Sequence, residues 1–272
     1  MSSVPEQYIK DVIGGKIPAS EYARKAVERH ANDLNKQGTK EFPYTFSKTE
    51  GQRVINFFKL LRHSKGEWAG SVFVLAPWQE FLIYVVFGWR TTEKTRRFRT
   101  VYLEVPRKNG KTTLAAGIGL YLLRGDDEPG AEIYAAATKY DQAKLCHTEA
   151  VRMVKSSPGL RGRISVYRNN LSIDETNSKF EPVGRDHDTL DGLNIHGAII
   201  DELHVHKTRE MWDVIDTGTG SRRQPLIFCI TTAGFDRQSI CWENHEYVEK
   251  ILDGIIEDET FFGIIYSVDE GD

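Results

Sequence analysis

The chain has 272 residues, a formal net charge of −3, and 40% hydrophobic and 28% charged residues. These values are ordinary for one large or two small globular domains, and they exclude a protein that is basic throughout, as many nucleic-acid binders are. No apolar run approaches the roughly 20 residues of a membrane-spanning helix, so we expect no membrane partner.

The cysteines and the N-terminus indicate a protein that stays in the cytoplasm. Cys146, Cys229 and Cys241 lie far apart and form no CxxC pair, which favours free thiols in a reducing compartment. Residues 1–5 lead into no apolar signal core. We therefore expect no export.

Residues 1–65 are predicted to form an N-terminal helical segment. Apolar residues recur at helical spacing over about 5–37 and again over about 48–63. Two glycines and a proline at 14–18 break the first run.

Residues 66–272 are predicted to form one α/β domain. Pro77 suits the first turn of a helix, whose apolar run 81–87 is typical of a buried amphipathic helix. From Arg99 on, short apolar strands alternate with helices, which indicates a mainly parallel central sheet flanked by helices. The predicted strands cover about 100–105, 131–137, 198–200, 226–230 and 261–266, with short strands within 163–183. The predicted helices cover about 112–123, 139–155, 211–215 and 239–252.

One stretch of this acidic chain is basic. Two interpretations are open: an ordinary solvated loop, or a local surface that contacts DNA phosphates. The residues concerned are Arg90, Lys94, Arg96, Arg97, Arg99, Arg107, Lys108 and Lys111.

A phosphate-binding loop is predicted between the strand at 100–105 and the helix that follows it. Backbone N–H groups and the helix dipole favour an anion there, and Gly110 lets the backbone approach it. Lys111 is expected to reach the β- and γ-phosphate oxygens of ATP, and Thr112 to ligate Mg²⁺. The usual first glycine of the pattern is replaced by Val105, so Gly-Lys-Thr alone is a weak signal. The loop consists of Pro106, Arg107, Lys108, Asn109, Gly110, Lys111, Thr112 and Thr113.

Two carboxylates at the end of another apolar strand strengthen this prediction. Asp201 and Glu202 follow the run 197–200. Since ligands bind at the carboxyl ends of parallel strands, we expect Asp201 beside the loop, where it holds Mg²⁺ through water. Glu202 is expected to orient and deprotonate the water that attacks the γ-phosphate. The two motifs together indicate hydrolysis of Mg-ATP.

Polar residues after the strands suggest further roles. Thr231 and Thr232 end the strand at 226–230 and are expected to sense the γ-phosphate and couple its loss to movement, with a plain strand-end turn as the alternative. His204 and His206 form an H-x-H pair of the kind that binds metals. No third ligand stands out, so we interpret them as loop residues, one of them facing the nucleotide.

These motifs resemble those of the large terminase subunit of tailed bacteriophages. The resemblance covers about residues 70–270 and keeps order and spacing. It rests on the loop, on the carboxylate strand with Leu203 and His204, and on residues 231–234. Three further segments agree. Residues 75–79 are similar to the family's adenine-binding glutamine motif, residues 136–143 to its segment after the second strand, and residues 190–194 to its lead-in to the carboxylate strand.

The resemblance implies a RecA-like P-loop ATPase of the class with an additional catalytic glutamate. It implies a motor that pumps double-stranded viral DNA into a procapsid in the host cytoplasm. Gln79, with Trp78, is then expected to hold adenine, and Arg107 is the basic residue that the family carries early in a loop without the first glycine. The implied partners are a small terminase subunit, the portal, and further copies in a ring, with a monomer in isolation.

Two departures limit what carries over. Many terminases have an arginine just before the glycine that precedes the carboxylate strand, where it acts on a neighbouring subunit's ATP; here Asp191 stands before Gly192. Full-length terminases continue into a nuclease domain, whereas this sequence stops at Asp272, so we expect no nuclease activity. The candidates for the trans-acting arginine are Arg185, Arg222 and Arg223.

Three other functions fit parts of the sequence. Residues 201–204 approach the signature of DEAH-like helicases, but residues 1–98 contain no second P-loop pattern. An ATP-switched DNA-binding adaptor would keep the site but release no phosphate. A small-molecule kinase would need an acceptor pocket and a lid that the sequence does not indicate.

Overall fold

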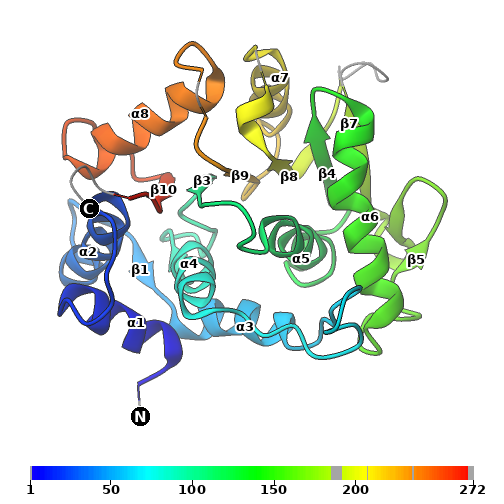
Figure 1. The fold of residues 1–272 in the computed structure, drawn as a ribbon, viewed down its shortest axis with the longest axis horizontal. Coiled ribbons are helices and arrows are strands. Elements are labelled where there is room, and N and C mark those ends of the chain that lie inside the picture. Colours follow the sequence, from blue (N-terminus) through cyan, green and yellow to red (C-terminus); the bar gives the residue numbers. More distant parts are fainter. Residues whose placement is uncertain (1, 185–191, 207, 235, 269–272) are drawn as a thin grey trace.

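The computed structural model describes residues 2–184, 192–206, 208–234 and 236–268. An eight-stranded sheet lies at its centre, with helices on both faces (Figure 1). The strand order is β10-β3-β9-β8-β4-β7-β6-β5, and neighbours from β10 to β7 are parallel, while β6 and β5 add an antiparallel edge. The prediction of a mainly parallel sheet is confirmed.

The strands of this sheet are β3 (Thr100–Glu104), β4 (Glu132–Ala137), β5 (Ser165–Val166), β6 (Leu171–Ile173), β7 (Ser178–Gly184), β8 (Ile195–Asp201), β9 (Leu226–Thr231) and β10 (Phe261–Ile265). A separate antiparallel pair consists of β1 (Thr45–Phe46) and β2 (Trp89–Arg90). The helices are α1 (Val4–Ile13), α2 (Glu21–Lys36), α3 (Lys48–Phe58), α4 (Pro77–Gly88), α5 (Lys111–Arg124), α6 (Tyr140–Ser156), α7 (Glu210–Gly218) and α8 (Ile240–Leu252), with short 3-10 turns η1 (Asp174–Thr176) and η2 (Leu203–Val205).

Each face of the sheet has its own hydrophobic core. Helices α3, α4, α5 and α6 cover one face, and α7 and α8 cover the other (Figure 1). Successive strand residues point to opposite faces, so Val101 and Leu103 of β3 enter the first core and Tyr102 enters the second. Burial on both faces explains why the strands are continuous apolar runs.

The N-terminal helices pack directly on the α/β domain. The predicted break holds, because α1 ends at Ile13 and α2 begins at Glu21. Helix α1 contacts α4, and α2 contacts β10 and α8. No helix in the described ranges is both long and apolar enough to cross a membrane.

Two expectations about helices were wrong in detail. Helix α3 ends at Phe58 rather than near residue 63, because Leu60 and Leu61 form tight turns and the Arg62 N–H donates to Ser157 Oγ at 2.9 Å. The run 81–87 is buried on every side rather than amphipathic, since α4 is packed between α1 and α3.

The strand order brings three strand ends to one edge. Strand β9 lies between β3 and β8, and all three run parallel. The backbone N–H of Val105 donates to Thr231 O at 3.0 Å, and that of Glu202 donates to Ile230 O at 2.8 Å. The segments after β3, β9 and β8 are thus neighbours, as expected for a ligand site in such a sheet.

Candidate nucleotide-binding site

The loop between β3 and α5 has the backbone shape of a phosphate cradle. Gly110 precedes α5 with φ of 70°, in the left-handed region that favours glycine. A Cβ added there would have only Gln79 Nε2 within 4 Å, at 3.9 Å, so backbone conformation rather than space requires glycine. The first N–H groups of α5 have no partner within the helix and are suited to an anion.

Val105 occupies the position where the usual pattern has its first glycine. Its side chain is buried, and its backbone continues the ladder of β3 by bonding to Thr231 O. An extended, buried position suits a β-branched residue. The loop therefore begins one residue later, at Pro106.

Thr112 and Asp201 are in direct contact. The Thr112 hydroxyl donates to Asp201 Oδ2 at 2.7 Å, while Asp201 Oδ1 is buried and has no hydrogen-bond partner in the described part of the chain. Burial raises the pKa of Asp201 to about 6; the Thr112 hydrogen bond opposes this, and the charge of Glu202 adds to it. An unpartnered carboxylate oxygen beside a hydroxyl fits a hard divalent cation such as Mg²⁺.

Glu202 faces the lysine of the loop. Lys111 Nζ lies 3.9 Å from Glu202 Oε1, and the lysine is only 6% exposed. Glu202 itself has φ of 59°, an uncommon conformation for a residue other than glycine. Such strain is frequent at functional sites, and here it turns the chain away from β8 immediately after Asp201.

His204 connects Glu202 to the threonines at the end of β9. Its Nδ1 lies 3.1 Å from Glu202 Oε2, 3.1 Å from Thr231 Oγ1 and 3.3 Å from Thr232 Oγ1. The Thr231 hydroxyl donates to Thr232 O and accepts from the backbone N–H of His204 at 3.1 Å. Glu202 Oε2 is buried and has no hydrogen-bond partner among the described residues. Among the described residues no group of three His, Cys, Asp or Glu side chains is arranged for a metal, so the H-x-H pair does not form such a site there.

Residues 77–250 match the family model described as "Terminase large subunit, ATPase domain". The chain belongs to this family. The match favours the terminase interpretation over the helicase and kinase alternatives. It also starts at the proline that begins α4, just before Trp78 and Gln79.

Individual relatives agree with this assignment. The large terminase subunit of Enterobacteria phage HK97 is 28% identical over 190 residues, which is 68% of this chain and 37% of that protein. Protein YmfN of Escherichia coli K12 is 44% identical over 82 residues, which is 30% of this chain and 18% of that protein. The crystal structure of the HK97 large terminase has a TM-score of 0.69 and 24% identity, over 82% of this chain and 45% of that one. The fold is the RecA-like P-loop ATPase fold, and the chain spans less than half the length of these relatives.

In this terminase ATPase domain, the Gln79 side chain of α4 is hydrogen-bonded to the phosphate-binding loop. Its Oε1 accepts from the Ala76 N–H at 2.9 Å, and its Nε2 donates to Asn109 O at 3.4 Å. Asn109 Nδ2 in turn donates to Pro106 O and Arg107 O. Trp78 packs against Tyr266, with ring centroids 5.4 Å apart. The glutamine thus links α4 to the loop, a role that the sequence did not indicate, and its contact with adenine stays a prediction.

Both interpretations of the basic stretch, a solvated loop and a DNA surface, are wrong for three of its arginines. Arg96 is fully buried and bonds both oxygens of Asp126, at 3.0 and 3.1 Å. Arg97 is buried against Asp33 and Glu259, and Arg90 pairs with Glu50 at 2.8 Å. These charges hold loops and helices together. Arg107 and Lys108, by contrast, are exposed in the loop itself.

The candidates for a trans-acting arginine have different surroundings. Arg185 lies outside the described residues. Arg222 donates to Asn194 O, Pro129 O and Gly130 O and pairs with Glu128 at 3.2 Å. Arg223 is 75% exposed, with Glu93 3.8 Å away. The trans-acting role stays a prediction, and of the two described candidates only Arg223 has an accessible side chain.

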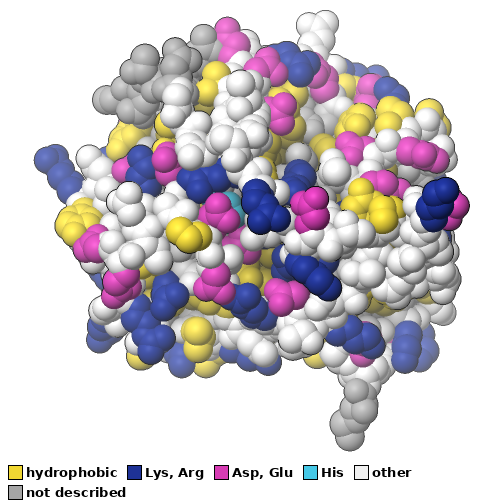
Figure 2. Space-filling view, turned by 180° about the vertical axis from the view of Figure 1, so that it is seen from behind, with side chains coloured by type: hydrophobic (Ala, Val, Ile, Leu, Met, Phe, Trp, Pro, Cys, Tyr) yellow, Lys and Arg dark blue, Asp and Glu magenta, His cyan; other side chains and the backbone are white. Residues whose placement is uncertain are grey.

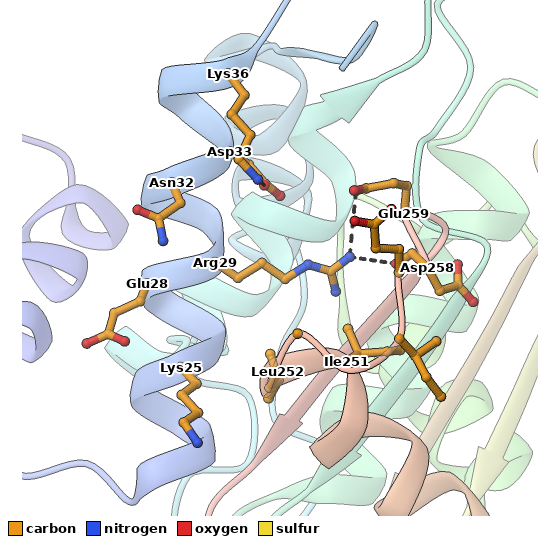
Figure 3. Close-up of a pocket in the computed structure, with 13 residues that line it drawn as sticks. Lys25, Glu28, Arg29, Asn32, Asp33, Lys36, Ile251, Leu252, Asp258 and Glu259 are labelled. Atoms are coloured by element: carbon orange, nitrogen blue, oxygen red, sulfur yellow. Dashed lines mark hydrogen bonds and ion pairs between the residues drawn. The ribbon is translucent and has the colours of Figure 1, made fainter. Parts of the chain in front are cut away.

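A cleft of about 290 Å³ lies between α2 and the segment that joins α8 to β10, away from the phosphate-binding loop (Figure 3). Arg29 points across it and donates to Asp258 O and Phe261 O, while Lys25 pairs with Asp253 at 2.6 Å. These charges satisfy one another and join α2 to the sheet. The cleft lies at the start of β10, whereas the phosphate-binding loop follows the end of the parallel strand β3.

Proposed function

We propose that this chain is the ATPase motor domain of a DNA-packaging terminase, which hydrolyses Mg-ATP to move double-stranded DNA into a procapsid. The observation that carries the proposal is the Thr112–Asp201 hydrogen bond at 2.7 Å, with Lys111 and Glu202 3.9 Å apart beside it. Transfer of a phosphoryl group to water requires groups that position the phosphates and a carboxylate that orients the water, and here the phosphate-binding turn lies in contact with two carboxylates.

Phosphate binding is the role of the loop. The N–H groups of the first α5 turn and Lys111 grip the β- and γ-phosphates, and exposed Arg107 adds a second positive charge. Lys111 leaves its neighbour Glu202 when a phosphate is bound, which frees that carboxylate. Gln79, which bonds the loop at Asn109 O, and its neighbour Trp78 hold the adenine.

Thr112 and Asp201 would hold Mg²⁺, because the Thr112 hydroxyl and the unpartnered Asp201 Oδ1 are oxygen donors of the kind that this ion prefers. The ion, when bound, neutralises charge on the phosphate oxygens. Asp201 and Thr112 orient it, and Glu202 accepts the proton of the attacking water. His204 holds Glu202 in position. When the γ-phosphate is lost, the contact between His204 and Glu202 changes, and Thr231 and Thr232 transmit that change to β9.

A phosphate-release assay separates this motor from an ATP-switched adaptor. The chain is mixed with Mg-ATP, with and without duplex DNA, and Glu202→Gln serves as the matched control. Release by the wild type that stops in the variant supports hydrolysis at this site. Binding of ATP without release by the wild type would refute the motor and support the adaptor.

Further copies of the chain, a small terminase subunit and the portal are the partners that this function needs, in the host cytoplasm. We propose that the isolated chain is a monomer whose site is completed by a neighbour in a ring. Phosphate release per molecule is then expected to rise with protein concentration, and Arg223→Ala tests whether that arginine is responsible. A rate per molecule independent of concentration would contradict the shared site. The absence of nuclease activity stays a prediction.

A further inference from the structure

A strongly basic surface lies at the end of the molecule away from the phosphate-binding loop. Residues 52–65 and 151–170 contain none of the chain's 39 Asp and Glu, although they contain nine of its 36 Lys and Arg. We call these nine residues the basic surface: Arg53, Lys59, Arg62, Lys65, Arg152, Lys155, Arg161, Arg163 and Arg168.

The two segments form one continuous surface. The Arg62 N–H donates to Ser157 Oγ at 2.9 Å, and Ser64 Oγ donates to Glu149 of α6 at 2.7 Å. Leu60 lies beside Gly159. In Figure 1 the segment that follows α3 reaches the end of α6 at the lower right, and Figure 2, seen from behind, shows Lys and Arg side chains at the lower left.

These side chains remain exposed, unlike the buried arginines near β2 and β3. Arg152 and Lys65 are 52% and 70% exposed, although both lie near Glu149, at 3.8 and 3.5 Å. Lys59, Lys155 and Arg163 are exposed too. Arg163 makes no ion pair with any described residue. The charges of Lys59, Lys155 and Arg163 are therefore directed to solvent, whereas Lys65 and Arg152 share the carboxylate of Glu149 and Arg53 pairs with Asp127.

Arginines from three elements also line a groove of about 450 Å³ within this surface. Arg53 comes from α3, Arg124 from the end of α5, and Arg163 from the segment before β5. The one acidic residue among those that line the groove is Asp127, which is paired with Arg53. Convergence from three elements distinguishes this surface from the solvated face of a single helix.

We propose that the basic surface contacts the phosphate backbone of duplex DNA; this inference rests on the proposed function. A motor that moves along DNA needs contacts that are independent of sequence, and Lys and Arg contacts to phosphates supply them. An acidic protein is the competing partner. The density of positive charge favours DNA, because interfaces with DNA are much more positively charged than protein–protein interfaces.

Helix α5 separates this surface from the nucleotide. It begins at Lys111 and ends at Arg124, and 14 helical residues span about 20 Å. Substitutions on the basic surface are therefore expected to leave hydrolysis without DNA unchanged. This separation makes DNA contact testable independently of catalysis.

The test is fluorescence anisotropy of a labelled duplex titrated with the chain at several salt concentrations. The variant is Lys59→Glu, Lys155→Glu and Arg163→Glu combined. The control is Lys10→Glu, Lys16→Glu and Lys40→Glu, which changes net charge equally at exposed sites in α1, after α1 and after α2. We expect the first triple to bind at least roughly tenfold more weakly and to lower the salt slope by about three. The control is expected to stay close to wild type.

Several results would overturn the proposal. These are wild-type affinity in the first triple, equal losses in both triples, or binding of polyglutamate as tight as that of duplex DNA. The triple Lys59→Gln, Lys155→Gln and Arg163→Gln repeats the test with a smaller charge change in case the reversal disturbs folding, which a thermal melt reports. Phosphate release without DNA is measured on the same samples. Its absence in the wild type would refute the proposed hydrolysis. Intact release together with unaltered DNA binding in both surface variants would refute only the DNA contact by the basic surface.

Discussion

The Thr112 hydroxyl donates a 2.7 Å hydrogen bond to Asp201 Oδ2, across 89 residues of sequence. This contact joins the first turn of α5 to the end of β8. Strand β9 lies between β8 and β3, the strand that leads into α5. Both motifs therefore belong to one site, in which the second oxygen of Asp201 is left for a cation. The predictions about catalysis depend on this arrangement.

Glu202→Gln is expected to bind ATP as the wild type does and to lose at least about 100-fold in kcat, because an amide cannot accept the proton of the attacking water. Gln keeps the size of the side chain, so the fold is preserved. Phosphate release measures turnover, and a fluorescent ATP analogue measures affinity. Turnover at the wild-type rate would remove Glu202 from the role of base.

Lys111→Ala is expected to weaken ATP binding by roughly 10- to 150-fold, since a charge-assisted contact to phosphate contributes about 1.5–3 kcal/mol. Lys111 is buried beside Glu202, so it already lies at the site before the nucleotide arrives. Equilibrium titration with the same ATP analogue is the measurement. Lys16→Ala, an exposed lysine in the turn after α1, is the control and is expected to bind normally.

Much of the fold was predictable because local patterns determine it. Continuous apolar runs indicated buried parallel strands, and the carboxyl ends of such strands meet at one edge of the sheet. The meeting of these strand ends is sufficient to predict that Asp201 lies near Thr112. The antiparallel edge formed by β5 and β6 was consistent with the short strands expected within 163–183.

The buried arginines were not predictable in the same way. Asp33 and Asp126, the partners of Arg97 and Arg96, stand at distant positions in the sequence and in different elements. A run of like charges gives no sign of such partners, so exposure was the natural expectation. The contacts of His204 with Thr231 and Thr232 likewise depend on the adjacency of β8 and β9, which only the strand order reveals.

His204→Ala is expected to lower kcat by about tenfold or more while the KM for ATP changes little, because His204 acts on Glu202 rather than on the nucleotide. His204→Asn places an amide nitrogen near the position of Nδ1 and is expected to recover part of the loss. Steady-state kinetics of both variants is the measurement. If both variants lose equally, or if KM rises with kcat unchanged, His204 does not position the base.

Asp126 is expected to stabilise the fold through a buried network that lies away from the nucleotide. It bonds Arg96 and lies 2.7 Å from His196 Nε2, and all three side chains are almost fully buried. Asp126→Asn leaves the Arg96 charge without its partner, which is expected to cost about 3–5 kcal/mol of unfolding free energy. Asp127→Asn is the matched control, because Asp127 is 67% exposed and its pair with Arg53 is expected to contribute about 1 kcal/mol or less.

The same network gives a pH dependence of known sign. Burial alone would raise the pKa of Asp126, but the Arg96 charge and the His196 contact outweigh burial and hold that pKa well below its usual value. A carboxylate with a lowered pKa in the folded state contributes stability above the unfolded pKa of about 4, and this contribution is lost as pH falls below it. Thermal unfolding from pH 7 to pH 3 is therefore expected to show a steeper fall in Tm for the wild type than for Asp126→Asn. Parallel curves for the two proteins would mean that Asp126 is not charged in the folded chain.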